Sequence, residues 1–398
     1  MKLFLNNLNK ICINIPMVNQ TNPIRFTGRG SNSLEGPSRD VFVKSAPATD
    51  ILFLGRRKGS TKKGDVLKEL DDITCPYSGV KMLNSRKMDQ LDYEFSQCKD
   101  MKDQLKLLDK NKKYMLPLEK SIYNTFKEYY AANPQGNMND CLNNLKPECL
   151  EKLKISELQV IDNIDALSNK ANAKTGLAVR RVTTDARKRI LNDTNESIFK
   201  RKDILSDIFK ATKGCHNKGL ANELWDEANK LPKSTNDYNA FVVKYANRSP
   251  IEIATRLIRP SVASIEHISP ANRNTAHASH GANDMTNFML ASVDWNSGRG
   301  NIALSEFVKN HPDIPKHSQE YTDDIISAIH KGKLVDNDWY PYVLKEKLYN
   351  ESEGLIDVSL DKYKISKDEA FKNAPVNAVD AYQKLKSANV EIRAKAEE

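Results

Sequence analysis

Apolar side chains recur three and four residues apart through most of residues 85–259, and this spacing constrains the fold more than any other feature. Lys, Glu, Asp and Leu fill the same stretch, as in helices with one buried side and a charged outer side. The Ser249–Pro250 pair suits a helix start, because the first helical residue needs no N–H partner. We therefore predict a long helical block here, without a repeat of fixed period.

The segments that flank this block have a different pattern. Residues 65–73 suggest a short helix, and residues 73–83 place two short apolar runs around a Pro-Tyr-Ser-Gly turn, as in a hairpin. Residues 260–305 hold short β-like runs, and helical spacing returns in 311–398. The predicted fold class is therefore α+β and predominantly α-helical.

The excess positive charge is concentrated near the N-terminus. The chain has 61 Lys and Arg against 52 Asp and Glu, and its first 70 residues hold 12 of the former and five of the latter. Such an arm attracts polyanions, nucleic acid or an anionic membrane surface, and Arg56, Arg57 and Lys58 are candidate nucleic-acid contacts. Residues 1–50 are rich in Asn, Pro, Gly and Ser, and this composition predicts disorder. A solvated basic tail without a specific partner stays open as the alternative.

Composition also limits the compartment. No stretch approaches the roughly 18 uninterrupted apolar residues of a membrane helix, which excludes a transmembrane protein. We expect no membrane partner. The six cysteines are scattered without a CxxC pair, as in a reduced protein rather than a disulfide framework. The opening segment is a poor signal peptide. We expect a cytoplasmic protein, and a secreted effector stays open.

One stretch, SIEHISPANRNTAHASHGANDMTNFMLASVDWNSGRGN, carries the residue types of a catalytic site. An acid–His pair follows a β-like run, a glycine-containing loop comes next, and an Asn opens an apolar run. A second Asn lies nine residues later, before a basic residue and glycine. The candidate site residues are Glu266, His267, His280, Asn287, Asn296 and Arg299.

This ordered set resembles the HNH endonuclease family, whose core is a ββα-metal unit. The resemblance covers about 40 residues, roughly a tenth of the chain. It implies a small HNH-like core into which the helical block is inserted. The predicted organisation is a disordered basic arm (1–50), a first knuckle-like hairpin (51–83), a helical insertion (84–260), the HNH-like core (261–310) and a helical C-terminal region (311–398).

The resemblance also implies a mechanism. His267 would be the general base, because a neutral imidazole accepts a proton near pH 7. Glu266 and Asn296 would hold one divalent cation, Mg²⁺ or Mn²⁺, through oxygen atoms. Asn287 would orient the His267 ring by a hydrogen bond.

The same resemblance assigns phosphate contacts. Arg299 lies one helical turn after Asn296, on the same helix face, and would pair with a phosphate oxygen. His280 is a second candidate for approach to phosphate, and a solvated loop is the favoured alternative for it.

The chain departs from the family pattern at two points. The first acid is Glu rather than the usual Asp, which moves the carboxylate by about one methylene. Of the four cysteines of a structural zinc site only Cys75 remains, since Ser78, Ser292 and Trp295 occupy the other positions. We therefore expect no structural zinc, with Trp295 filling the space by packing.

Three functional hypotheses follow. The first is a metal-dependent HNH-like endonuclease that cuts DNA, with RNA left open and a possible protein partner for the helical block. The second is a catalytically inactive HNH-derived module that binds nucleic acid or protein. The third is a mostly helical structural protein with a chance motif, which a wide separation of residues 266–267 from 287–296 would favour.

Overall fold

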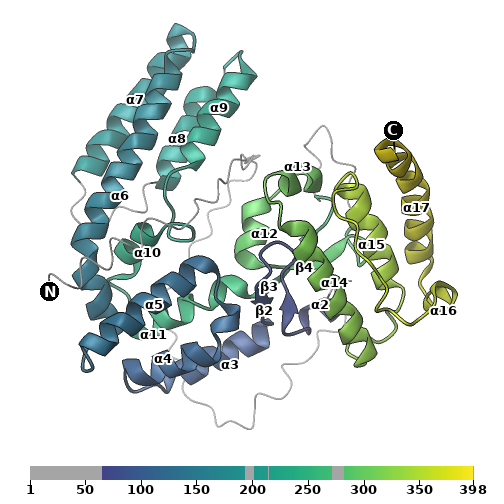
Figure 1. The fold of residues 1–398 in the computed structure, drawn as a ribbon. Coiled ribbons are helices and arrows are strands. Elements are labelled where there is room, and N and C mark those ends of the chain that lie inside the picture. Colours follow the sequence, from purple (N-terminus) through teal and green to yellow (C-terminus); the bar gives the residue numbers. More distant parts are fainter. Residues whose placement is uncertain (1–64, 193–200, 214, 271–281, 398) are drawn as a thin grey trace, which may run out of the picture.

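A computed structural model describes residues 65–192, 201–213, 215–270 and 282–397. The predicted arm at 1–50 lies outside these ranges. Within them the chain is predominantly helical, which confirms that part of the predicted fold class (Figure 1). No helix in these ranges is long and apolar enough to cross a membrane.

A short helix and a small hairpin come first. Helix α2 covers Asp65–Lys68, and strands β1 (Ile73–Thr74) and β2 (Lys81–Met82) pair antiparallel. In the turn between them Gly79 has φ +68°, a conformation that costs glycine little. A Cβ there would lie 2.6 Å from the His317 ring, so the turn has no room for a side chain. The predicted hairpin is confirmed.

Helices fill the region between this hairpin and the next strand, as the spacing predicted. Capping boxes begin two of them, formed by Asn137 with Asp140 and by Ser249 with Glu252, and these satisfy otherwise unbonded N–H groups. In chain order the helices are α3 (Ser85–Ser96), α4 (Met101–Lys110), η1 (Lys112–Tyr114), α5 (Pro117–Ala132), α6 (Met138–Ser168), α7 (Ala173–Leu191), α8 (Arg201–Thr212), α9 (Lys218–Asn229), α10 (Tyr238–Tyr245), α11 (Pro250–Arg256) and η3 (Arg259–Ser261).

Two separate apolar cores hold these helices together. Helices α3, α4, α5, α10 and α11 enclose the first with the N-terminal half of α6, which contributes Leu142. Helices α7, α8 and α9 enclose the second with the C-terminal half of α6, which contributes Ile161. We call this second group the finger, because it projects away from the strands (Figure 1).

Two longer strands and a helix follow the helical block. Strand β3 (Ala263–His267) pairs antiparallel with β4 (Phe288–Ser292), and α12 (Val293–Arg299) begins directly after β4. All five residues of β4 are buried. We call these elements the β3–β4–α12 unit, and its strand–strand–helix order is the one expected from the sequence.

The helical block begins and ends at adjacent points of the backbone. Leu83 forms a parallel bridge with Val262, the N–H of Leu83 donates to the carbonyl of Ser261 at 3.3 Å, and the N–H of Ala263 donates to Leu83 at 2.9 Å. A segment whose two ends meet can be added to a smaller fold without separating its parts. This geometry favours an insertion, and the domain boundaries themselves stay a prediction.

The C-terminal helices pack around the β3–β4–α12 unit and the hairpin in one core. Residues distant in sequence meet there, including Leu67, Met82, Leu290 and Tyr321. The helices are α13 (Leu304–Lys309), α14 (Ile314–His330), α15 (Tyr340–Glu351), α16 (Lys367–Phe371) and α17 (Val376–Glu397).

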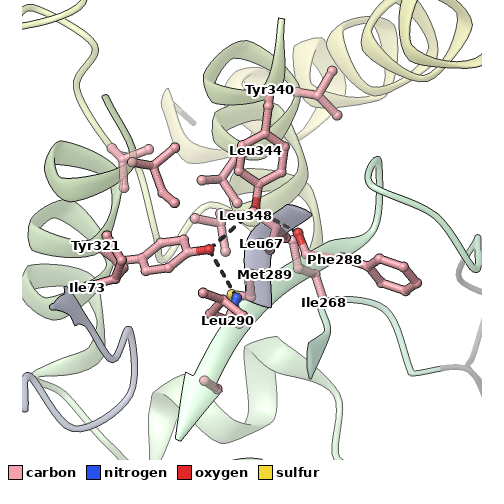
Figure 2. Packing of buried hydrophobic residues seen from close by; sticks show 14 of the residues in the cluster. Leu67, Ile73, Ile268, Phe288, Met289, Leu290, Tyr321, Tyr340, Leu344 and Leu348 are labelled. Carbon is pink, nitrogen blue, oxygen red and sulfur yellow. Dashed lines mark hydrogen bonds between the residues drawn. The ribbon is translucent and has the colours of Figure 1, made fainter. Parts of the chain in front are cut away.

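Two buried tyrosines satisfy the free edge of β4 (Figure 2). The N–H of Leu290 donates to the Tyr321 hydroxyl at 3.0 Å, and the Tyr340 hydroxyl donates to the carbonyl of Phe288 at 2.8 Å. The two hydroxyl oxygens are 3.4 Å apart. Buried backbone N–H and C=O groups need hydrogen-bond partners. Tyrosines of α14 and α15 supply them at this edge, where a third strand would otherwise be needed.

Candidate functional site

The motif residues lie together on the β3–β4–α12 unit. His267 pairs with Phe288 across the two strands, and Glu266 pairs with Met289. The first motif segment is therefore beside the second, which is not the wide separation expected of a chance motif. Helix α12 packs on β3 through Asn296, whose Nδ2 donates to Ser264 Oγ and to the carbonyl of Ile265, both at 2.9 Å.

His267 ends strand β3 with its ring half-buried. The ring packs edge-on against Phe288, with centroids 4.8 Å apart. Its Nε2 lies 3.2 Å from Oδ1 of the exposed Asn283. Because an amide oxygen only accepts, this contact places the proton on Nε2 and leaves Nδ1 as the basic nitrogen.

Asn287 does not have the role that the resemblance implied. Its side chain is 1% exposed and bonds to backbone: Oδ1 accepts from the N–H of Ser269 at 2.8 Å, and Nδ2 donates to the carbonyls of Ser269 and Ala282, both at 3.0 Å. It therefore joins the chain after β3 to the chain before β4. The hydrogen bond to the His267 ring comes from Asn283 instead.

Arg299 is also placed differently from the prediction. Its side chain is 0% exposed, and it forms a salt bridge with Glu266. It further donates to the Tyr77 hydroxyl at 3.0 Å and to the carbonyls of His267 and Ile268 at 2.9 and 2.7 Å. A guanidinium enclosed in this way cannot reach a phosphate, so the predicted phosphate contact is corrected to a structural one.

Glu266, Arg299 and Tyr77 form one buried network. The Tyr77 hydroxyl donates to Glu266 Oε1 at 3.0 Å, on the oxygen that also receives Arg299. Burial raises the pKa of the Glu266 carboxyl, while Arg299 and Tyr77 oppose that rise. Burial likewise raises the pKa of Tyr77 well above its ordinary value. Pairing is what makes these buried polar groups tolerable.

Two oxygen atoms of the predicted metal ligands remain free of hydrogen bonds to the described residues. They are Oε2 of Glu266 and Oδ1 of Asn296, since the bonds of these side chains use Oε1 and Nδ2. A carboxylate and an amide oxygen fit a hard cation that keeps most of its ligands as water. The guanidinium on the other oxygen of Glu266 opposes cation binding, because its charge has the same sign.

Two of the degenerate knuckle positions, Cys75 and Ser292, are in contact. Cys75 Sγ lies 3.6 Å from Ser292 Oγ and accepts from the N–H of Ser292 at 3.4 Å. Trp295 packs against Tyr77 and Phe307, with ring centroids 6.5 and 6.1 Å apart. The expected packing role of Trp295 is therefore seen, and it attaches the hairpin to α12 by aromatic contact.

Two residues of the site had no predicted role. Asn283 lies in the motif, four residues before Asn287, and its place among the amides of the motif was the available signal. Tyr77 lies 189 residues before Glu266, so no local pattern connects them. Of the predicted nucleic-acid contacts, His280 and the Arg56–Lys58 run lie outside the described residues.

The chain matches no known family model, no curated protein and no solved structure. Within the described ranges no group of three or more His, Cys, Asp or Glu side chains is arranged to hold a metal ion. The expected ligand pair contains an amide and a single carboxylate, so it is not a group of that kind.

Proposed function

We propose that this chain is a metal-dependent endonuclease of the HNH type that hydrolyses phosphodiester bonds in DNA. The observation that supports this best is the joint position of Glu266, His267 and Asn296 on one strand–strand–helix unit. The order of the elements and the register of β3 with β4 agree with the resemblance of the motif. The third hypothesis, a chance motif, is correspondingly disfavoured.

His267 is the proposed general base. Its Nδ1 would take a proton from the attacking water while Asn283 holds the proton on Nε2. The Phe288 ring fixes the plane of the imidazole from one side. The resulting hydroxide attacks phosphorus, the bond from phosphorus to the leaving oxygen breaks, and that oxygen takes up a proton from solvent water.

Glu266 and Asn296 are the residues that would hold the cation, through Oε2 and Oδ1. When bound, a divalent cation supplies positive charge to the phosphate and the leaving oxygen. Other residues of the chain orient these ligands. Arg299 and Tyr77 bind the Glu266 carboxylate, and the Asn296 amide donates to Ser264. Arg299 takes no part in phosphate binding.

Cleavage of supercoiled plasmid tests the proposal. Purified protein is incubated with Mg²⁺, Mn²⁺ or EDTA, and wild type is compared with His267→Ala. We expect metal-dependent nicking that falls about 10²–10⁴-fold in the variant, the usual contribution of a general base. The matched control is His216→Ala, an exposed histidine that follows α8, which should cut like wild type. A single-stranded RNA substrate tests the open alternative.

One observation favours the second hypothesis, an inactive nucleic-acid-binding module. The salt bridge to Arg299 gives Glu266 a cation from within the chain, and this reduces the need for a metal. In that case the wild-type protein would bind DNA with a salt-dependent affinity and would not cleave it with any of the metals. Cleavage by His267→Ala at the wild-type rate would also contradict the base assignment.

A further inference from the structure

Among the helices and strands that the structure describes, α7 is the most positively charged one outside the site. Over Ala173–Leu191 it has one acidic residue, Asp185. Its basic residues are Lys174, Arg180, Arg181, Arg187, Lys188 and Arg189. No function described above uses this helix.

Three of these cations have local partners. Arg187 pairs with Asp162 of α6 at 2.6 Å, Arg189 pairs with Asp185, and Arg180 donates to Asn169 Oδ1 at 3.3 Å. Lys174, Arg181 and Lys188 are exposed and form no ion pair with the described residues. Half of the positive charge of α7 is thus available to a partner.

The three available cations lie on one line along the helix. They are seven residues apart, which at 1.5 Å per residue is about 10.5 Å, so the line is about 21 Å long. Between and beyond them lie Leu177, Thr184 and Leu191, also exposed. We call these six residues the α7 face. The opposite side of the helix is buried against α6 and α8 and contributes Val179 to the finger core.

We propose that the α7 face binds the phosphate backbone of duplex DNA. A regular row of flexible cations matches a regular row of phosphates. The one acid between them, Asp185, is paired with Arg189. An interface with an acidic protein would require an apolar centre, whereas the two leucines of the face lie toward its ends. The partner rests on the proposed function, since DNA is the substrate proposed there.

The β3–β4–α12 unit itself gives a second reason. Its two strands and its helix contain a single Lys or Arg, which is Arg299, and that side chain is enclosed. Affinity for a polyanion must therefore come from cations elsewhere in the chain. The α7 face supplies a row of them on a rigid support.

DNA binding in EDTA tests this inference without involving cleavage. A 30-base-pair duplex is titrated at several salt concentrations against wild type and against Lys174→Gln/Arg181→Gln/Lys188→Gln. We expect at least about tenfold weaker binding and a salt slope smaller by about 2–3, one unit for each lost phosphate contact. These side chains are exposed, so the thermal unfolding of the variant should match wild type.

A control variant removes the same three charges from α17. Lys384→Gln/Lys386→Gln/Lys395→Gln alters exposed lysines of that helix and should change affinity less than about twofold. Equal losses in both variants, or no loss in the α7 variant, would overturn the inference. A loss confined to binding of a poly-glutamate peptide would instead assign the face to an acidic protein, against our proposal.

The experiments distinguish failure of the α7 proposal from failure of the proposed function. Plasmid cleavage with unchanged DNA binding by the α7 variant would overturn the α7 face alone. DNA binding that depends on α7, in a protein that never cuts, would uphold the face and overturn the endonuclease.

Discussion

The β3–β4–α12 unit and the finger use charge in opposite ways. In the unit, Glu266 and Arg299 are buried and joined to Tyr77 across 189 and 222 residues of sequence. In the finger, the pairs Arg187–Asp162 and Arg189–Asp185 lie at the surface, within one helix or with its neighbour, while Ile161 and Leu224 fill the core. A buried acid of the finger, Glu227, pairs with Lys230 of the next turn.

The difference separates two kinds of candidate residue. A cation enclosed by its own fold stabilises that fold and is lost to a ligand, as Arg299 is. A cation on a helix that its neighbours already hold in place contributes little to stability and remains free for a partner. Residue type and spacing alone do not distinguish the two, because the spacing from Asn296 predicted Arg299 as a phosphate contact and its burial excludes that role.

The largest effect is expected when the buried pair is broken. Arg299→Ala leaves the Glu266 carboxylate enclosed without its cation, which should lower the free energy of unfolding by about 3–5 kcal/mol. Arg187→Ala removes a finger pair whose side chains are 39% and 50% exposed, and should cost at most about 1 kcal/mol. Urea unfolding followed by far-UV circular dichroism measures both changes.

A second substitution shows whether the uncompensated charge is the cause. Adding Glu266→Gln to Arg299→Ala removes that charge and should restore part of the loss. Equal losses for Arg299→Ala and Arg187→Ala would break the comparison between the two regions.

A cavity in the finger should have a large but local effect. Leu224→Ala opens the second core, at a cost of about 2–5 kcal/mol. Since that core shares no residue with the core around β4, hydrogen exchange should become faster in α7, α8 and α9 and stay unchanged in α14 and α15. Faster exchange in all five helices would show that the two regions unfold together.

Loss of the Asn287 amide should have an intermediate effect. Asn287→Ala leaves the buried N–H and carbonyl of Ser269 without this partner, at a cost of about 1–3 kcal/mol. The finger control is Asn163→Ala, an exposed amide that donates to Glu227 at 2.7 Å, with an expected change within about 0.5 kcal/mol. Denaturant midpoints of the two variants would be compared. A larger loss for Asn163→Ala would reverse the ranking of the regions.

Local patterns predicted the elements well. Apolar spacing gave the helical block, the Ser249–Pro250 pair gave the start of α11, and the Pro-Tyr-Ser-Gly turn gave the hairpin. The motif also predicted that an apolar strand leads directly into α12. Each of these features depends on residues close together in the chain, where sequence periodicity is informative.

The partners of the site residues could not be predicted in this way. Arg299 meets Glu266 and Tyr77 only because the hairpin packs on α12, and no spacing encodes that contact. Asn287 bonds to backbone because the chain leaves β3 and returns to β4 on either side of it. Burial decided both roles, and burial follows from the complete fold.

The smallest effect is expected at a buried pair within the helical block itself. Glu119 of α5 is 1% exposed, accepts from Arg256 at 2.9 Å, and has its second oxygen enclosed without a partner. Burial raises its pKa to about 7, with the charge of Asp294 acting in the same direction and Arg256 opposing it. The folded state therefore prefers the protonated carboxyl.

The sign of the pH dependence follows from this preference. A carboxyl with a pKa near 7 when folded and near 4.5 when unfolded contributes stability below about pH 4.5 that is lost as the pH rises to about 7. Glu119→Gln cannot titrate, so its unfolding free energy should fall less between pH 5 and 7 than that of wild type, by on the order of 1–2 kcal/mol. Urea unfolding at each pH measures the difference, and parallel curves would place the titrating group elsewhere. If the unfolding free energy of Glu119→Gln depends less on pH than that of wild type, buried charge affects stability in the helical block as well as in the β3–β4–α12 unit.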